Sequence, residues 1–111
     1  GRGARVIMAC RNRDKAQKAT NEIFNAYKSF SWSGVGEIIN YTIDLSSMTS
    51  IQEFCKEILE KEHNIDILIN NAGISQRALV KDASLDIDRR IMEINFFAVS
   101  ALTKLVLPKI Y

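Results

Sequence analysis

The pattern of hydrophobic and polar positions divides the first half of the chain into a strand, a helix and a second strand. Residues 5–10 form a nearly unbroken apolar run, which favours a parallel strand buried on both faces. Helical spacing follows at Ala16, Ala19, Ile23 and Tyr27. Residues 28–36 are rich in Ser and Gly and predict a loop, and residues 37–43 predict the second strand.

The second half of the chain continues this alternation. Residues 44–47, Asp-Leu-Ser-Ser, end the second strand and offer a hydroxyl N-cap to a helix. The apolar face of that helix consists of Met48, Ile51, Cys55, Ile58 and Leu59. Residues 65–69 predict a third short strand, and a long helix is predicted from Ser84 to near Pro108. The inward stripe of the long helix consists of Ile87, Ile91, Ile94, Ala98, Ala101, Leu102 and Leu105.

The order strand, helix, strand, helix, strand, helix predicts an α/β fold, specifically a Rossmann-type doubly wound parallel sheet. The chain has 111 residues, enough for one small domain, and we expect residues 1–111 to form part of such a domain. With 47% hydrophobic and 25% charged residues, the composition is that of an ordinary globular domain. A net charge of +2 is too close to neutral for a dedicated nucleic-acid binder.

Neither a membrane span nor a signal peptide is predicted. The longest apolar stretches are residues 6–10 and 96–107, and Ser100, Thr103 and Lys104 interrupt the second of them. The first residue is Gly rather than Met, so we expect a processed product, a recombinant product or a fragment of a longer protein.

Metal, redox and phosphate-loop motifs are not indicated. Cys10 and Cys55 lie far apart in apolar patterns, so we expect buried, reduced thiols. His63 is the single histidine and has no companion at metal-ligand spacing. Residues 1–3, Gly-Arg-Gly, lead into a strand, and Val6 breaks the G-x-G-x-x-G pattern, so they predict a turn rather than a phosphate loop.

Three polar clusters follow the three predicted strands. They are Arg11–Asn12–Arg13, Asp44–Leu45 and Asn70–Asn71–Ala72–Gly73. Open α/β sheets bind ligands outside the carboxyl ends of their strands. Polar loops explain any one cluster equally well, but the three together favour a nucleotide-shaped site.

Arg11 has the most specific chemistry among these residues. In dinucleotide-binding folds an acid near this point binds the adenosine 2′-hydroxyl, whereas a cation accommodates a 2′-phosphate. The forked donors of a guanidinium suit phosphate, and Arg13 lies close in sequence. The alternative is a solvated arginine at the start of a helix, and Asp14 offers an ion-pair partner for either arginine.

Asn95 falls on the apolar stripe of the long helix, between Ile91 and Ala98. A polar side chain there needs hydrogen-bond partners or a wet cavity. By itself, this position favours a core amide that is satisfied by its neighbours.

Taken together, these motifs resemble the short-chain dehydrogenase/reductase family over essentially the whole chain. The matching segments are residues 2–7 with 9–12, residues 44–45, residues 66–73, and residues 92–95 with 106–108. A strand followed by Asn-Asn-Ala-Gly is specific by itself. Residues 73–77 and 84–86 are similar, more weakly, to a membrane-associated subgroup of the family.

The resemblance implies an oxidoreductase that uses NADP(H), or else NAD(H), to move a hydride between nicotinamide C4 and a carbonyl carbon. The implied cofactor-binding residues are Arg11, Asn12, Arg13, Asp44, Leu45, Asn71, Ala72 and Gly73. Arg11 would bind the 2′-phosphate, and Asp44 would hydrogen-bond the adenine. Asn95 would be the Asn of the family's catalytic Asn-Ser-Tyr-Lys set, where it holds a water that relays protons to the Lys.

The chain departs from the family in what it does not contain. None of Tyr27, Tyr41 and Tyr111 begins a Tyr-x-x-x-Lys pattern, and the family's Gly-rich turn with its first strand is missing. In the family's strand order that first strand lies between two strands of this chain, so we expect unpaired edges and a loosely folded or aggregation-prone piece. The piece itself would be inactive.

For the longer protein, the resemblance implies a small-molecule alcohol or carbonyl substrate of lipophilic character and no nucleic-acid partner. A missing N-terminal segment would hold it at a membrane, facing the cytosol, at the endoplasmic reticulum by analogy. A homodimer is also implied.

Two alternatives stay open. A non-catalytic relative that binds a dinucleotide fits the sequence, since Asn95 alone belongs to the catalytic set. A methyltransferase with a nucleoside cofactor would use a similar sheet, but it would want an acid directly after the strand at residues 5–10, and Arg11 at that place argues against it.

Overall fold

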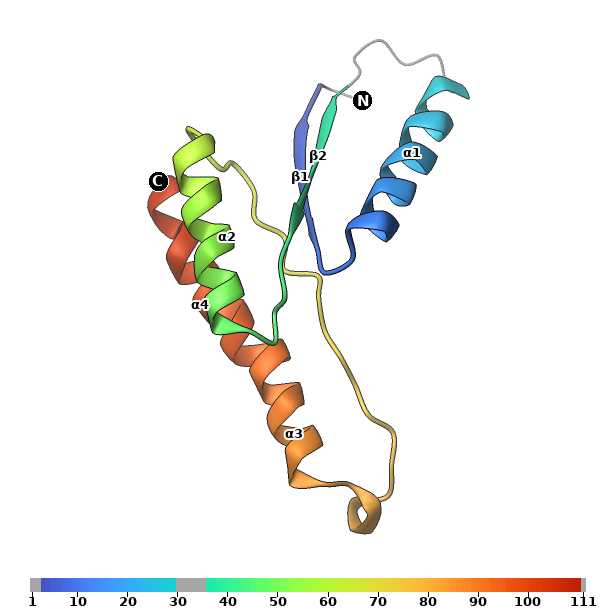
Figure 1. The fold of residues 1–111 in the computed structure, drawn as a ribbon, viewed down its shortest axis with the longest axis vertical. Coiled ribbons are helices and arrows are strands. Elements are labelled where there is room, and N and C mark those ends of the chain that lie inside the picture. Colours follow the sequence, from blue (N-terminus) through green and yellow to red (C-terminus); the bar gives the residue numbers. More distant parts are fainter. Residues whose placement is uncertain (1–2, 30–35, 111) are drawn as a thin grey trace. The chain divides into compact units, whose positions relative to one another are not determined.

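The computed structural model describes residues 3–29 and 36–110 (Figure 1). Most of the predicted loop at 28–36 lies outside the described residues, and so does Tyr111. The chain divides after Ile43 into two compact units, called here the first and the second unit, and each is described by itself.

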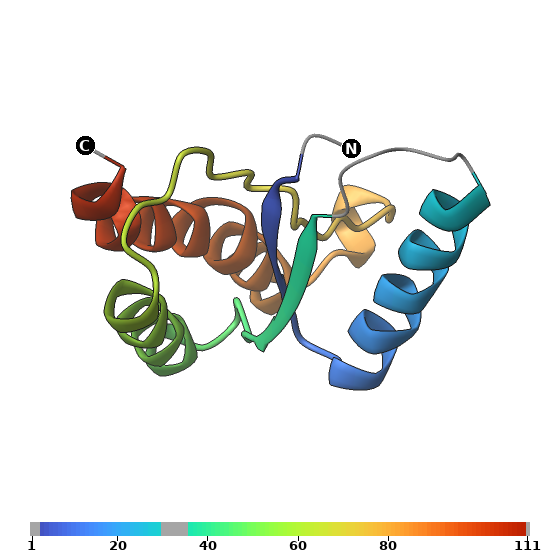
Figure 2. The same cartoon turned by 90° about the horizontal axis from the view of Figure 1, so that it is seen from above.

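The first unit consists of two parallel strands connected by a helix. Strand β1 (Arg5–Cys10) pairs with β2 (Glu37–Thr42) along its whole length, and α1 (Arg13–Ser29) connects them. Figure 2 shows α1 on one side of the strand pair. Both predicted strands and the predicted helix of this unit are confirmed.

Helix α1 packs on the strands through its first half. Ala16 and Thr20 are buried, whereas Ile23 is 36% and Tyr27 43% exposed. The Thr20 hydroxyl donates to the Ala16 carbonyl of its own helix over 3.0 Å and accepts from the Asn40 side-chain amide of β2, also over 3.0 Å. The bond from Asn40 attaches the helix to the second strand.

Strand β1 is less buried than its apolar run predicts. Val6 is 48% exposed, and Ala9 is exposed as well. Within the described part of the first unit, α1 is the one helix and covers one face of the strands. The prediction of a strand buried on both faces is therefore wrong for this structure.

The second unit is helical. It begins with α2 (Met48–Lys61) and continues through a 3₁₀ turn, η1 (Val80–Asp82). A long helical run follows, composed of α3 (Leu85–Met92), a π-helical segment η2 (Glu93–Ala98), α4 (Val99–Val106) and the 3₁₀ turn η3 (Leu107–Lys109). The predicted long helix is confirmed, and its π-helical middle is a feature that the hydrophobic pattern does not predict.

Helices α2 and α4 lie side by side and form the core of the second unit (Figures 1 and 2). The buried residues are Ile51, Phe54, Cys55 and Ile58 of α2, with Ile94, Ala98 and Val106 of the long helical run. The predicted N-cap is confirmed, because the Ser47 hydroxyl accepts from the Ser50 amide over 3.2 Å. Met48, predicted to face inward, is 41% exposed.

The predicted third strand, residues 65–69, does not form. The described residues contain one sheet, of two strands, and Ile67 and Ile69 are 77% and 78% exposed. A strand needs a neighbour to bond with. In the order of a complete doubly wound sheet, the neighbour of this segment is the first strand of the fold, which comes before the strand called β1 here. No described residues supply that strand, so the apolar segment stays irregular and the prediction is wrong for this structure.

The helical run Leu85–Lys109 is long and apolar enough to cross a membrane by length and composition, with a mean hydropathy of 1.4 over its best window. This differs from the prediction, which treated residues 96–107 by themselves. Length and composition are weak evidence of a span, since core helices of soluble proteins share them. In this structure the run carries apolar side chains that are exposed.

Candidate functional site

Arg11 lies between the end of β1 and the start of α1, as the sequence predicts. It is exposed and forms no hydrogen bond or ion pair with the described residues of its unit. Asp14, the ion-pair partner that could have neutralised it, pairs with neither Arg11 nor Arg13 there. The guanidinium of Arg11 therefore keeps its donors available for an anion.

Asn12 is the N-cap of α1. Its side-chain oxygen accepts from the Lys15 amide over 2.9 Å, and its carbonyl accepts from the Ala16 amide over 3.1 Å. The next residue, Arg13, is exposed and opens the helix. The side-chain oxygen of this predicted cofactor-binding residue is thus used within the fold, and two exposed guanidinium groups flank it.

Asp44 and Leu45 form the turn between β2 and α2, at the start of the second unit. The Asp44 carboxylate accepts from the amide of Ser46 over 2.9 Å and from its hydroxyl over 2.7 Å. The Asp44 amide donates to the Ser50 hydroxyl over 2.9 Å. Asp44 and Leu45 are half-buried, and these bonds hold the turn in one conformation.

Residues 70–73 are exposed and irregular, and a hydrogen bond ties the segment to the long helical run. The side-chain amide of Asn70 donates to the Thr103 hydroxyl over 3.1 Å. A Cβ placed on Gly73 would lie 3.5 Å from Asn95 Oδ1, an ordinary contact distance. The predicted cluster is therefore carried on the same unit as Asn95.

Asn95 lies in the π-helical segment η2 and binds the backbone of Ile74 on both sides. Its side-chain oxygen accepts from the Ile74 amide over 2.9 Å, and its side-chain nitrogen donates to the Ile74 carbonyl over 2.8 Å. The prediction of a satisfied amide is confirmed, although Asn95 is exposed rather than in the core. A π-helical turn inside an α-helix often marks a functional position.

Some features of the candidate site have no signal in the sequence. The π-helical segment is one, since its backbone change leaves the apolar spacing nearly intact. Gln76 is another, because its side-chain oxygen is buried without a hydrogen-bond partner among the described residues. Among the residues that the structure describes, no group of three His, Cys, Asp or Glu could hold a metal ion.

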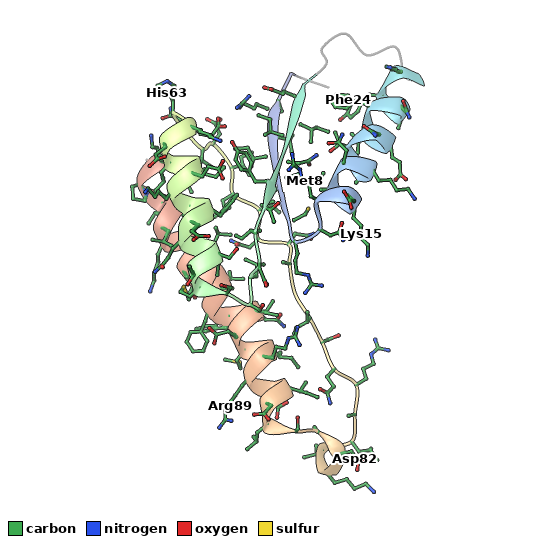
Figure 3. The ribbon with its side chains drawn as sticks, viewed as in Figure 1. Met8, Lys15, Phe24, His63, Asp82 and Arg89 are labelled. Carbon is green, nitrogen blue, oxygen red and sulfur yellow. The ribbon has the colours of Figure 1, made fainter. Side chains whose placement is uncertain are left out.

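The structure brings the predicted residues together in two groups. Arg11, Asn12 and Arg13 belong to the first unit, where Cys10 pairs with Thr42, so the carboxyl ends of β1 and β2 leave the sheet at the same edge. The remaining predicted residues, Asp44, Leu45, Asn71, Ala72, Gly73 and Asn95, belong to the second unit. Figure 3 shows the side chains, with Lys15 in the first turn of α1.

Each unit, taken by itself, carries chemistry that suits part of a nucleotide. In the first unit, a guanidinium that is exposed and has no partner among the described residues of that unit suits the dianionic phosphate of an adenosine 2′-phosphate. In the second unit, a carboxylate on a turn held by hydrogen bonds suits the amino group of adenine. The described residues contain no Gly-rich turn between a strand and a helix, the element that binds a pyrophosphate.

Comparisons with known proteins show which family the chain belongs to. A family model described as short chain dehydrogenase matches residues 1–111. Dehydrogenase/reductase SDR family member 7B of Rattus norvegicus is 41% identical over 106 residues, which cover 96% of this chain and 32% of that protein. Retinol dehydrogenase 14 of Homo sapiens is 42% identical over 86 residues, which cover 71% of this chain and 26% of that protein.

Solved structures give the same result. A metagenomic short-chain oxidoreductase in complex with NADP matches with a TM-score of 0.81 and 25% identity, over 96% of this chain and 45% of that one. The predicted Rossmann-type α/β fold class is confirmed. The chain spans about a third of the length of the curated relatives that match it along most of its length.

Proposed function

Because the chain belongs to the short-chain dehydrogenase family, we propose that it forms the adenosine-binding side of an NADP(H)-dependent enzyme that interconverts an alcohol and a carbonyl. The observation that carries the cofactor preference is Arg11, an exposed guanidinium directly after β1 that has no partner among the described residues of its unit. An acid at this place would favour the unphosphorylated ribose. The metagenomic relative was solved in complex with NADP, and this supports the same preference.

The chain's own residues would bind and orient the cofactor rather than perform the chemistry. Arg11, with Arg13 nearby, would hold the 2′-phosphate. Asp44 would accept from the adenine amino group, with the Leu45 backbone beside it. Asn71, Ala72 and Gly73 would line the adenosine side. When bound, the cofactor supplies the hydride.

Asn95 would contribute indirectly to proton transfer, by holding an ordered water. Its side-chain amide already binds both backbone groups of Ile74, so its orientation is fixed before any ligand arrives. A carbonyl oxygen has two lone pairs, which leaves Asn95 Oδ1 capacity for a further donor. A water placed there would be held by a rigid group.

We further propose a lipophilic alcohol or carbonyl as the substrate class. The support is the retinol named in one relative, which is 42% identical over the matched region. The remaining two thirds of the full-length protein would supply the substrate pocket. A direct comparison of retinol with a short hydrophilic alcohol in that protein tests this class.

A charge reversal in the full-length protein tests the cofactor preference. Arg11→Asp is expected to raise KM for NADPH by about a hundredfold and to leave KM for NADH within a few-fold, because a charge-assisted phosphate contact becomes a repulsion. Arg90→Asp makes the same change of charge on an exposed arginine of α3 and is the matched control. An unchanged cofactor ratio in Arg11→Asp would contradict the proposal.

Non-catalytic dinucleotide binding is the second candidate, and one observation favours it. Asn95 is the one member of the catalytic set in this chain, and both polar atoms of its side-chain amide already bind the backbone of Ile74. A full-length protein that binds NADPH but oxidises none of it with any carbonyl offered would establish this alternative.

A further inference from the structure

The connection between β1 and α1 is short and is fixed at both ends. Cys10 is the last residue of β1, and its carbonyl accepts from the Ile43 amide over 3.2 Å. Asn12 is the N-cap of α1, through the two bonds to the amides of Lys15 and Ala16. Arg11 is the residue between these two anchors.

We propose that Asn12 is a positioning residue for the cofactor phosphate: its helix cap, and not a contact with the cofactor, sets the direction of Arg11 and Arg13. This inference rests on the proposed NADP(H) preference. The side-chain oxygen of Asn12 accepts from the Lys15 amide, in the first turn of α1 (Figure 3), so this oxygen already has a role within the fold. The two guanidinium groups beside it are exposed.

The cap matters because no polar contact holds the side chain of Arg11 within the described part of its unit. Arg11 forms no hydrogen bond or ion pair with the described residues there, so the conformation of its backbone contributes to where the side chain points. An arginine side chain that must be ordered on binding loses rotamer freedom, and this loss weakens the contact. A backbone held on both sides restricts the region that the guanidinium can reach.

A second anchor holds the same helix against the sheet. The side-chain amide of Asn40 in β2 donates to the Thr20 hydroxyl over 3.0 Å, and Thr20 is buried. The same side-chain amide donates to the Gln17 side-chain oxygen over 3.5 Å. The middle of α1 is therefore held by Asn40, and its first turn is capped by Asn12. Loss of the cap would free that turn without detaching the helix.

The test compares cofactor preference in cap variants of the full-length protein. Asn12→Ala removes the cap acceptor and is expected to raise KM for NADPH by several-fold, up to about tenfold, with KM for NADH changed by less than about twofold and kcat unaltered. Asn12→Ser keeps a cap acceptor on a different side chain and is expected to restore the NADPH value. Amide exchange at Lys15 reports the cap directly, being fast in Asn12→Ala and slow in Asn12→Ser.

Ser47→Ala is the matched control, because it removes the equivalent cap of α2. It is expected to lower stability without changing the cofactor ratio, which is KM for NADH divided by KM for NADPH. A ratio that stays constant in Asn12→Ala while Arg11→Ala lowers it would overturn the positioning role and leave the proposed function intact. A ratio that falls in Asn12→Ala and is not restored by Asn12→Ser would show a direct contact with the cofactor, and would also overturn it. A constant ratio in Arg11→Ala would overturn both proposals.

Discussion

Replacing Asn95 by Ala should release the segment around Ile74 from the long helical run. The side chain of Asn95 makes two hydrogen bonds, of 2.8 and 2.9 Å, to the carbonyl and amide of Ile74. Residues 71–79 have no secondary structure of their own, so these bonds hold a stretch of chain that no ladder supports.

The expected magnitude follows from the number and the exposure of these bonds. Each hydrogen bond contributes about 0.5–1.5 kcal/mol net, and two together about 1–3 kcal/mol. Both bonds are exposed, so water can replace the lost partner, and the lower half of that range applies. A local free-energy change of about 1–2 kcal/mol corresponds to about a five- to thirtyfold faster exchange of the Ile74 amide hydrogen.

Amide hydrogen exchange, resolved by residue in the full-length protein, measures this effect. Asn95→Asp keeps an acceptor for the Ile74 amide and loses the donor to its carbonyl, so about half of the free-energy change is expected. Asn70→Ala removes a hydrogen bond to Thr103 from the same segment and is the matched control. If Ile74 exchanges equally fast in Asn95→Ala and Asn70→Ala, the reasoning is refuted.

Three further predictions concern stability and reactivity. Ile58→Ala empties a fully buried position of α2 and should lower the free energy of unfolding by about 2–5 kcal/mol, measured by denaturant titration. Burial raises the pKa of the Cys55 thiol, so a maleimide should modify the less buried Cys10 first. Because Cys55 ionises more readily in the unfolded chain than in the folded one, stability should fall as the pH rises through the ordinary thiol range. The 111-residue chain alone should aggregate through its exposed segment at 65–69, and Ile67→Lys should slow this, as light scattering would show; a sharp, cooperative melt of a monomer would contradict it.

Local features of the sequence predicted local structure well. The helix beginning after Asn12 and the Ser47 cap depend on neighbours within a few residues, so their patterns are sufficient. The strand at 5–10 forms because its partner β2 lies in the same unit. The segment at 65–69 has an equally clear apolar pattern and forms no strand, because strand formation needs a partner that is distant in sequence. The same limit explains the exposure of Val6. The face of β1 that carries Val6 is covered by no element among the described residues of the first unit.

The candidate site follows the same division between local and distant information. The chemistry of Arg11 is readable from its place after a strand, but the use of its neighbour is not, since Asn12 could bind a ligand or cap a helix equally well. The structure decides between them through one bond, from the Lys15 amide to the Asn12 side-chain oxygen. For Asn95 the deciding contacts are distant in sequence. The oxygen and the nitrogen of its side-chain amide both bind Ile74, which lies more than twenty positions away, and no local pattern indicates this contact. A residue that a family uses for catalysis can therefore also hold the fold together, and in Asn95 both uses would require the same fixed orientation of one amide.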